Sequence, residues 1–257
     1  MKLIINADDF GLSPGVNHGI VDAFKRGAVR STTMMVGMPG EDHGVELAKA
    51  NPQLSIGIHL RLTAGKPMCD NPETLTDASG RFLDQLSFYD SDSLCPKEIE
   101  REFRAQIEHF LKLGLTPTHF DSHHHCYGHP IALPVISKLS KEYGIPYRTV
   151  DASQVTEIAT ETARYTYRFT DRFYGKVSLQ MLLDIVDKEL AERGHNAILE
   201  VMCHPAYIDQ GLMEASSYTE ARVKELDILT SAELQQNLTS RGIELTDYKE
   251  ISKLTNL

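Results

Sequence analysis

The N-terminal stretch of the chain, residues 1–15, reads MKLIINADDFGLSPG. Its apolar run Leu3–Ala7 predicts a buried strand, and the acidic pair Asp8-Asp9 ends that strand. Ser13 is a typical helix N-cap, and Pro14 suits the first turn of the helix that follows. A strand joined at once to a capped helix is the unit from which α/β folds are built.

The same alternation continues along the rest of the chain. The hydrophobic pattern predicts further strands at Ser31–Val36, Leu54–Leu60, Thr118–Asp121, Ile145–Val150, Ala197–Met202 and near Ile243–Leu245. Besides the first helix, which closes at Gly27, helices are predicted at Glu41–Ala50, Pro96–Leu113, Ile131–Tyr143, Val177–Arg193, Thr219–Leu229 and Ala232–Arg241. The segment Asp151–Gly175 has the pattern of irregular structure. This order predicts a parallel sheet with helices outside it.

The length of the chain leaves two architectures of this class. At 257 residues, a (β/α) barrel and an open doubly wound sheet are both of suitable size. The strands are few and some are weak. The sequence also lacks the Gly-x-Gly-x-x-Gly and Gly-x-x-x-x-Gly-Lys motifs of nucleotide-binding sheets. We therefore expect an α/β fold in the form of an irregular (β/α) barrel.

We expect a single domain over residues 1–257, with a long loop or insertion around residues 61–93. That segment breaks the strand–helix rhythm and is rich in proline, glycine and polar residues. Loops of this length inside a compact domain are usually functional or mobile, so a lid over a site and a contact between subunits are both open alternatives. A homodimer is expected only from the base rate of twofold dimers among soluble oligomers.

Charge and apolar runs limit the classes of partner. The 26 basic and 36 acidic residues give a net charge of −10, which argues against nucleic acid or an anionic membrane surface as the main partner. No stretch approaches the ~18 consecutive apolar residues of a membrane span, and the N-terminal apolar run is too short for a signal peptide. The four cysteines include no Cys-x-x-Cys pair, which indicates reduced thiols. We expect a cytoplasmic protein.

Residues that can carry chemistry gather at the ends of the predicted strands. The pair Asp8-Asp9 ends the first strand, and His59 ends the third. A cluster from His119 to His125, which includes Asp121, His123 and His124, lies at and just after the fourth, and His204 follows the strand Ala197–Met202. In α/β barrels the carboxyl ends of the strands carry the active site. Aspartate and histidine at four such ends therefore predict a metal site.

Histidine is concentrated in one short stretch of the sequence. Five of the 11 histidines lie between His119 and His129, where this composition would place about half of one. Chance or a solvated turn would also produce such a run, whereas its internal position excludes an expression tag. Its place after a strand end favours metal binding or catalysis.

Single members of this set have simpler interpretations. In the simpler interpretation, the pair Asp8-Asp9 caps the next helix. In the alternative, one carboxylate binds a metal and the other remains free as a general base. Taken alone, His59 and His204 would each be a core histidine bonded to a neighbour. Cys126 and Cys203, which flank histidines, are candidates for thiolate ligands or nucleophiles, but buried small hydrophobic residues are the commoner case. The shared strand-end position favours the functional interpretation for the acids and histidines.

The type of ligand constrains the metal and the reaction. Two imidazoles and one carboxylate with an open position suit Zn²⁺, Co²⁺, Ni²⁺ or Mn²⁺, whereas Mg²⁺ prefers oxygen ligands and waters. Such an ion lowers the pKa of a bound water to roughly 7 and polarises a carbonyl group. A carboxylate nearby can accept the proton of the water, and a histidine can protonate a leaving group. These parts predict a hydrolase for an amide or ester.

Several blocks of the sequence resemble one known family. In chain order they are Asn6–Gly11, Gly57–Leu60 with Leu62-Thr63, Thr118–His125, Glu200–Pro205, and Arg222 with Glu225–Thr230. Together they are similar to the YdjC-like carbohydrate deacetylases, and most of all to the chitooligosaccharide (chitobiose) deacetylases. The resemblance implies an irregular barrel related to the polysaccharide deacetylases, and metal-dependent removal of N-acetyl groups from acetylated sugars.

The resemblance also assigns roles to residues of this chain. It implies that the metal ligands are Asp9, His59 and His123, that Asp8 is the general base, and that His204 protonates the leaving amine. The remaining assignments are positions that support the site or face the substrate, namely His125, Asp121, Arg148 and Tyr174. The family is associated with Mg²⁺, whereas the ligand types favour Zn²⁺ or another transition metal, so the identity of the one divalent ion stays open.

The expected substrate is a small acetylated oligosaccharide such as diacetylchitobiose or its phosphate, which would place the enzyme in chitin and polysaccharide degradation. Cys126-Tyr127 stands where close relatives often carry a further histidine, and the chain has no tryptophan to stack on a sugar. A short ligand held largely by hydrogen bonds follows from this. Two alternatives remain, namely another metallohydrolase (a phosphoesterase or amidohydrolase) and a non-enzymatic regulator that binds sugar or metal.

Overall fold

The computed structural model of the protein describes residues 1–150, 156–159 and 164–255. Its strands are β1 (Lys2–Phe10), β2 (Ser31–Met34), β3 (Ser55–Leu60), β4 (Phe120–Ser122), β5 (Thr156–Ala159), β6 (Arg164–Thr170), β7 (Ala197–Cys203) and β8 (Glu244–Thr246). Its helices are α1 (Pro14–Arg26), α2 (Glu41–Ala50), α3 (Gln85–Tyr89), α4 (Pro96–Lys112), α5 (Leu133–Tyr143), α6 (Leu179–Arg193), α7 (Gln210–Ala215), α8 (Glu220–Thr230), α9 (Ala232–Ser240) and α10 (Tyr248–Thr255). Two 3₁₀ turns are η1 (His123–Gly128) and η2 (Gly194–Asn196).

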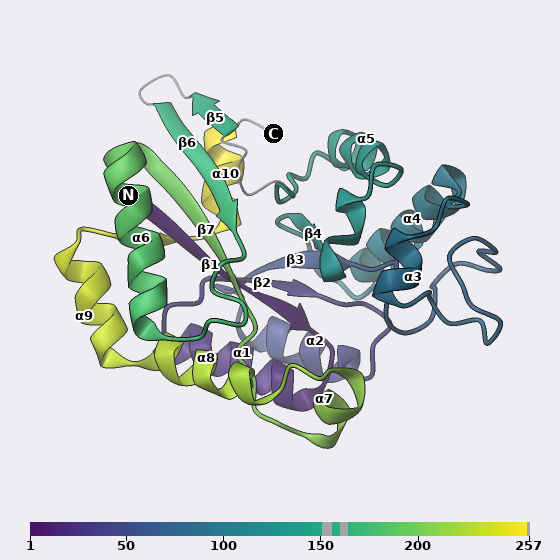
Figure 1. Ribbon diagram of the computed structural model, residues 1–257, viewed down its shortest axis with the longest axis horizontal. Coiled ribbons are helices and arrows are strands. Elements are labelled where there is room, and N and C mark those ends of the chain that lie inside the picture. Colours follow the sequence, from purple (N-terminus) through teal and green to yellow (C-terminus); the bar gives the residue numbers. More distant parts are fainter. Residues whose placement is uncertain (151–155, 160–163, 256–257) are drawn as a thin grey trace.

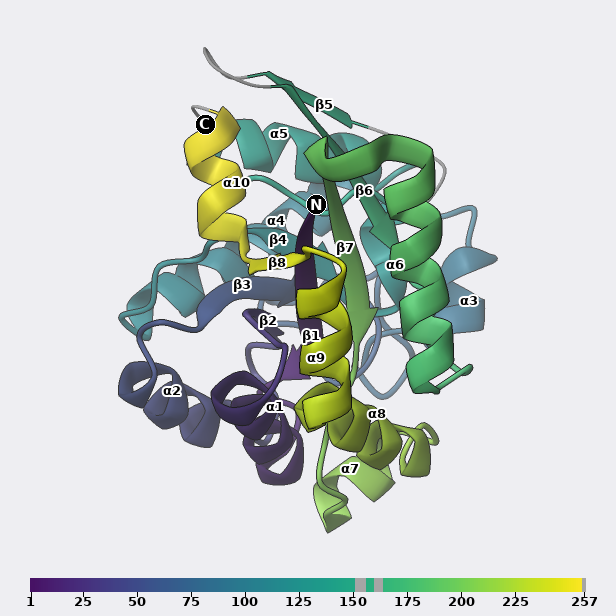
Figure 2. The ribbon, with the colours of Figure 1, turned by 90° about the vertical axis from the view of Figure 1, so that its left-hand side faces the viewer.

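One sheet joins the strands in the order β4-β3-β2-β1-β7-β6-β5, and β8 pairs with β1. All of these pairs are parallel except β5 with β6, which is antiparallel. Strands β1 and β7 run through the middle of the molecule, and the helices surround the sheet (Figures 1 and 2). Within the described residues the hydrogen-bonded order ends at β4 on one side and at β5 on the other. The architecture confirms the expected α/β fold, with a curled sheet that forms an irregular, incomplete barrel.

The two faces of β1 contact different parts of the core. Alternate residues of Leu3–Ala7 pack in the main hydrophobic core. Ile4, on the other face, belongs to a smaller cluster with Tyr248 of α10. Because side chains alternate along a strand, Asn6 and Asp8 lie on the same face as Ile4. This face of β1 therefore changes from apolar to polar toward the carboxyl end of the strand.

Local signals in the sequence explain where the first helix begins and ends. Ser13 has an extended backbone and accepts a hydrogen bond from the Val16 N–H, as a helix N-cap does. Pro14 occupies the first helical position, and Gly27 follows the last. These contacts confirm the predicted helix. The helices α3, α7 and α10 were not predicted; with 5, 6 and 8 residues, they are too short for a clear helical period.

The strand predicted at Ile145–Val150 is wrong. Tyr147 forms only a single parallel bridge with Phe120 of β4. In that bridge the Phe120 N–H donates to Pro146 O, and the Arg148 N–H donates to Phe120 O. The pairing cannot be extended through Pro146 because proline has no N–H to donate.

The prediction of irregular structure over Asp151–Gly175 is wrong for residues 156–159, which form β5, and for residues 164–170, which form β6. The sequence there, RYTYRFT, alternates aromatic and polar residues, which is a strand pattern. The strand joins the sheet beside β7, with Tyr167 opposite Ile198. Residues 151–155 and 160–163 of the same segment lie outside the described residues.

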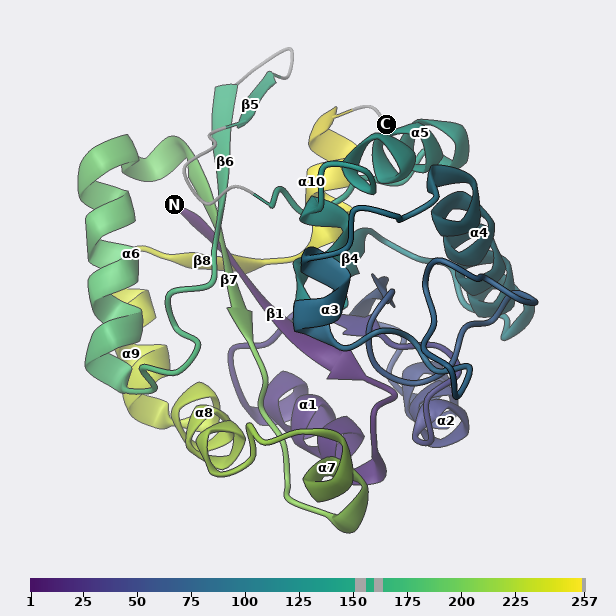
Figure 3. The same ribbon diagram turned by 45° about the vertical axis from the view of Figure 1, so that its right-hand side comes forward.

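The segment of residues 61–93 lies against α4 and contains the short helix α3 (Figure 3). Glu102 of α4 accepts hydrogen bonds from the Met68 and Cys69 N–H groups, at 2.9–3.0 Å. The fully buried guanidinium of Arg61 donates to the carbonyl groups of Val36, Ala64 and Lys66. Buried side chains at its start and on α4 therefore hold the segment in a defined conformation.

Among the described residues, no helix is long and apolar enough to cross a membrane.

Candidate metal centre and cleft

A bulge at the end of β1 brings two adjacent carboxylates to the same site. The register between β1 and β2 shifts between Ala7 and Phe10, and Asp9 has a φ of 72°, in the left-handed region. Successive side chains on a regular strand point to opposite faces, whereas the bulge lets Asp8 and Asp9 both line one cleft. A non-glycine residue in this conformation is strained, and such strain clusters at functional sites.

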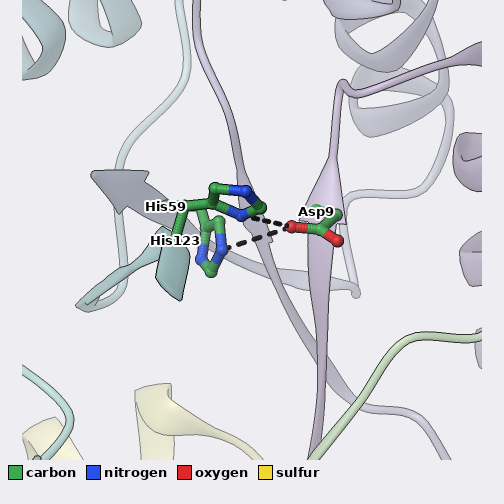
Figure 4. Close-up of side chains that lie close together, drawn as sticks. All are labelled: Asp9, His59 and His123. Atoms are coloured by element: carbon green, nitrogen blue, oxygen red, sulfur yellow. Dashed lines mark hydrogen bonds and ion pairs between the residues drawn. The ribbon is translucent and has the colours of Figure 1, made fainter. Parts of the chain in front are cut away.

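Asp9 lies at the centre of a group of three possible metal ligands. Its Oδ1 atom is 3.3 Å from His59 Nε2 and 3.1 Å from His123 Nδ1. Figure 4 shows the two rings directed at the same carboxylate oxygen. The three ligand atoms lie within 4.8 Å of one another and come from β1, β3 and the turn that follows β4.

Asp121 orients the His59 ring from behind. His59 Nδ1 is 2.7 Å from Asp121 Oδ1, and the other oxygen of Asp121 accepts a hydrogen bond from Thr33 Oγ1 at 2.8 Å. Burial alone would lower the pKa of His59, but the adjacent carboxylates, Asp121 foremost, raise it to about 10. A carboxylate on the remote nitrogen of a metal-binding histidine is a common support.

The donor types of this group fit a divalent cation. Burial alone would raise the pKa of Asp9, but Arg222 and the two histidines hold it well below its usual value. Arg222 Nη2 donates to Asp9 Oδ2 at 2.7 Å, which leaves Oδ1 facing His59 and His123. One carboxylate oxygen and two imidazole nitrogens converging in a largely buried site are the donor set of a transition-metal centre.

Asp8 has a different environment from its neighbour. Its two oxygens each accept a hydrogen bond from Arg148 at 2.8 Å, and Oδ1 also accepts one from Asn6 Nδ2 at 2.8 Å. Burial alone would raise its pKa, but Arg148 holds the pKa of Asp8 well below its usual range. Asp8 is therefore an ionised, oriented carboxylate beside the three candidate ligands.

A second group of potential ligands, formed by Asp8, His59 and Asp121, already has a cation among its carboxylates. Arg148 Nη2 is 2.9 Å from Asp121 Oδ2, and Arg148 Nε donates to Glu200 at 2.8 Å. The guanidinium thus bridges three carboxylates where a second metal ion would otherwise lie.

Two of the residues assigned as supporting the site or facing the substrate, Arg148 and Asp121, lie beneath the cleft. Arg148 is 1% exposed and Asp121 is 0% exposed, so neither faces the cleft. The fully satisfied network of carboxylates holds Arg148 beneath the site, and the bond to His59 holds Asp121 behind it. Both residues support the site from inside the protein.

The other predicted residues line the cleft, which has a volume of about 680 Å³. His125 lines the cleft, and burial lowers its pKa. His204 lies at the end of β7, where burial, with Arg222 adding to the effect, lowers its pKa to about 3. Tyr174 is half exposed and meets His204 edge-on, with the ring centres 5.4 Å apart.

The histidine cluster forms a tight turn, η1, in the part of the chain that follows β4. His124 and His125 have φ values of 53° and 52°, both in the left-handed region. Tyr89 of α3 donates from its hydroxyl group to the carbonyl oxygens of both residues, at 3.0 and 2.9 Å. This unusual backbone lets consecutive histidines reach one cleft, and the 61–93 segment supports it.

The two cysteines beside histidines are buried and belong to neither group of possible metal ligands among the described residues. Cys126 Sγ donates to Leu60 O and Cys203 Sγ donates to Asn6 O. Burial raises the pKa of both thiols, that of Cys126 to about 12. These environments support the interpretation as buried small residues.

Some residues of the site were not assigned a role from the sequence. Arg222 and Glu225 were noted only as part of a resembling block, although their spacing of three places both on one face of α8. Arg222 binds Asp9, and Glu225 accepts a hydrogen bond from the His204 N–H. Thr33 and Tyr218 had no distinguishing signal, since their partners lie far away in the sequence.

The comparisons with known proteins agree with this geometry. The family model described as "YdjC-like protein" matches residues 2–240. A protein of Vibrio cholerae serotype O1 named carbohydrate deacetylase is 46% identical, over 98% of this chain and 96% of its own length. A crystal structure from Enterococcus faecalis V583, provisionally described as a cellobiose-phosphate cleavage protein, superposes with a TM-score of 0.88 at 34% identity, over 97% of this chain and 98% of that chain. A solved peptidoglycan N-acetylglucosamine deacetylase shares the fold, with a TM-score of 0.53 at 13% identity, over 99% of this chain and 88% of that chain.

Proposed function

The chain belongs to the YdjC-like family, and on that premise we propose that it is a carbohydrate deacetylase that removes N-acetyl groups from small acetylated sugars. The observation that carries the proposal is the pairing of two functions at the end of β1. Asp9 joins His59 and His123 in a metal-type donor set, while Asp8 stays free of that set and ionised. The names of the relatives support the carbohydrate substrate.

A divalent ion would be held by Asp9, His59 and His123. When bound, it supplies a Lewis acid that polarises the amide carbonyl and makes a water more acidic. Two imidazole ligands favour Zn²⁺ or another transition metal over Mg²⁺, which prefers oxygen ligands. Asp121 fixes the His59 ring, and Arg222 fixes Asp9, so the donor set is oriented before any ion arrives.

Asp8 is the residue we assign as general base. Its carboxylate accepts the proton of the attacking water, and the two bonds from Arg148 keep the carboxylate oriented toward the cleft. A bidentate guanidinium also keeps this group ionised at neutral pH. Substitution of Asp8 would therefore stop proton removal without removing a metal ligand.

His204 is the residue we assign to deliver the proton that the leaving amine needs. It lines the same cleft as Asp8, and its Nδ1 atom has no hydrogen-bond partner among the described residues. Because its pKa is about 3 in the free site, His204 is neutral at pH 7. We expect the imidazole to take up a proton from solvent when negative charge develops on the bound substrate and to pass that proton to the leaving amine.

We further propose diacetylchitobiose or its phosphate as the substrate. The cleft has room for a short ligand, and the half-exposed ring of Tyr174 and the imidazole of His125 lie in its lining. Arg81, which also lines the cleft, would favour a phosphorylated sugar. Comparing kcat/KM for the free and phosphorylated disaccharides in the wild type and Arg81→Gln distinguishes the two.

The rival metallohydrolases and the regulator have less support. A two-metal phosphoesterase needs a second ion, and the guanidinium of Arg148 already occupies the neighbouring group of carboxylates. A protein that only binds sugar or metal has no use for the ionised Asp8 beside its ligands. Three expectations remain predictions, namely that the sugar derives from chitin, that the protein is cytoplasmic and that it forms a homodimer.

Acetate release from diacetylchitobiose tests the proposed function. Protein treated with a chelator is assayed alone and after addition of Zn²⁺, Co²⁺, Ni²⁺, Mn²⁺ or Mg²⁺. We expect no release from the metal-free protein and restored release with at least one transition-metal ion. Equal release with and without metal would contradict the metal-dependent mechanism. No release from any acetylated sugar, despite one bound ion per chain, would contradict the deacetylase assignment.

A further inference from the structure

Two tyrosines form a stacked pair in the lining of the cleft, near His204. The rings of Tyr174 and Tyr218 have centres 4.4 Å apart and planes inclined by 27°. Both residues line the cleft, and each ring meets His204 edge-on, at 5.4 and 5.8 Å between ring centres. The Arg222 guanidinium lies over the Tyr218 ring at 5.7 Å from its centre. Tyr218 is thus held by its neighbours, whereas Tyr174 is 49% exposed.

A chain of hydrogen bonds joins this pair to the backbone of His204. The Gly175 N–H donates to the Tyr218 hydroxyl oxygen at 3.2 Å, and that hydroxyl group donates to Glu225 Oε1 at 2.6 Å. Glu225 Oε2 accepts the His204 N–H. Gly175 has a φ of 73°, a conformation that favours glycine and that directs its N–H to Tyr218.

Burial of the Glu225 carboxylate in this position has a cost in folding free energy. It is 0% exposed, and its two hydrogen bonds come from a neutral hydroxyl group and a backbone N–H. Among the described residues no salt bridge reaches Glu225, although Arg222 lies one turn before it on α8. Burying a carboxylate without an ion-pair partner costs stability, and such local costs concentrate at functional sites. We therefore expect the hydrogen bonds that Glu225 accepts from Tyr218 and from the His204 N–H to have a functional role.

We propose that Tyr218 and Glu225 are positioning residues that fix Tyr174 as a sugar-stacking platform against the His204 side of the cleft. This inference rests on the proposed function, since it names how the same cleft holds its sugar. An exposed aromatic ring offers an apolar face to the C–H groups of a pyranose ring, and the chain has no tryptophan for that purpose. Tyr174 comes from the turn after β6 and Tyr218 from the segment before α8, and the stack and the hydrogen bonds join these two distant segments.

The central test is Tyr218→Phe, which keeps the ring and removes the hydroxyl group. The Gly175 N–H and Glu225 then each lose a partner, and the Tyr174 loop is less ordered. We expect KM for diacetylchitobiose to rise ~10-fold while kcat changes by less than ~3-fold, because loss of the partly buried hydrogen bond to Glu225 weakens binding to that extent. Metal content should equal that of the wild type.

Two comparisons separate positioning from general damage to the fold. Glu225→Gln keeps an acceptor for the His204 N–H and should bind sugar better than Glu225→Ala. Glu220→Gln removes an exposed acid from the same helix and should match the wild type. In a double-mutant cycle, Tyr218→Phe should add little to Tyr174→Ala, because the hydroxyl group acts through Tyr174.

Binding of chitobiose, the deacetylated product, is measured by calorimetry in parallel because it needs no turnover. A ~10-fold weaker chitobiose affinity in Tyr218→Phe supports the inference even if the wild type releases no acetate, a result that would count against the proposed function alone. Unchanged affinity in Tyr218→Phe, additive effects in the cycle, or no binding of the disaccharide to the wild type would each overturn the inference.

Discussion

The two sides of the cleft are built in different ways. On the side of the candidate ligands, the side chains come mostly from strand ends, and buried charges pair with one another, as Arg148 does with Asp8, Asp121 and Glu200. On the side of Tyr174, most side chains come from turns and from α8, and the rings of Tyr174 and Tyr218 stack on each other. We infer from this difference that residues at the rigid strand ends carry out the reaction, whereas residues of the loops determine which sugar binds.

The largest effect is expected on the strand side, from removal of a metal ligand. His59→Ala should lose both bound metal and turnover, with kcat/KM falling ~10³-fold or more, because one of three donors is gone. Metal content by mass spectrometry and acetate release measure the two effects. His18→Ala, which removes an exposed histidine, is the control. Normal metal content and activity in His59→Ala would contradict the assignment of His59 as a metal ligand.

Asp8→Asn separates catalysis from metal binding. The variant should keep its metal and lose roughly 10²-fold or more in kcat, because the amide cannot accept the proton of the attacking water. Titration with Zn²⁺ and steady-state kinetics on diacetylchitobiose measure both. Loss of metal together with activity would instead make Asp8 a ligand.

The buried ion pairs of the strand side should also dominate stability. Arg148→Met leaves buried carboxylates without their cation, and we expect a loss of about 3–5 kcal/mol in the free energy of unfolding. Arg104→Ala breaks a more exposed pair with Glu142 and should cost about 1 kcal/mol or less. Urea unfolding of both variants measures the contrast. Equal losses would remove the distinction between the buried network and a surface pair.

On the loop side, Tyr174→Ala should weaken sugar binding and spare the reaction. We expect KM for diacetylchitobiose to rise ~10-fold with kcat within ~3-fold of the wild type, because the ring contacts the bound sugar and not the reacting amide. Tyr174→Phe keeps the ring and serves as the control. A fall in kcat with unchanged KM would place Tyr174 in the reaction itself.

The last effect is a dependence of stability on pH that arises from Glu225. Burial raises the pKa of this group to about 7 in the folded protein, from an ordinary value of 4.5. The folded state therefore binds this proton more tightly than the unfolded chain does. The stability it contributes is full below pH 4.5 and is lost as the pH rises toward 7.

Glu225→Gln lacks this titration and isolates its effect. Between pH 4.5 and pH 7, the wild type should lose up to roughly 3 kcal/mol of unfolding free energy relative to the variant. Urea unfolding of both proteins across this range measures the difference. Parallel curves would show that Glu225 titrates as an ordinary exposed acid.

The same two sides differ in how far the sequence predicts them. Strand ends can be located from apolar runs, and the resemblance to the family implied that Asp9, His59 and His123 share a metal, so their convergence was expected. The part played by Arg148 was not, because its partners Asp8 and Glu200 lie 140 and 52 positions away. Nothing local distinguishes a buried guanidinium from one that faces a sugar.

The loop side was predicted least well. Tyr174 was selected from its sequence context, but the bonds that hold it pass through Tyr218 and Glu225, which are joined to it only by the fold. The strand β6, which leads to Tyr174, was missed although its sequence alternates. Helical and apolar periods locate elements of regular structure, whereas contacts between two turns leave no period in a sequence.

The most direct test of the central claim is a crystal structure of the protein loaded with Zn²⁺, with the ion located by anomalous scattering. We predict one peak per chain, bound by Asp9, His59 and His123 at roughly 2.0–2.2 Å, with Asp8 still paired with Arg148. A peak bound by Asp8 and Asp121 in place of Arg148, or two peaks in the cleft, would contradict the assignment.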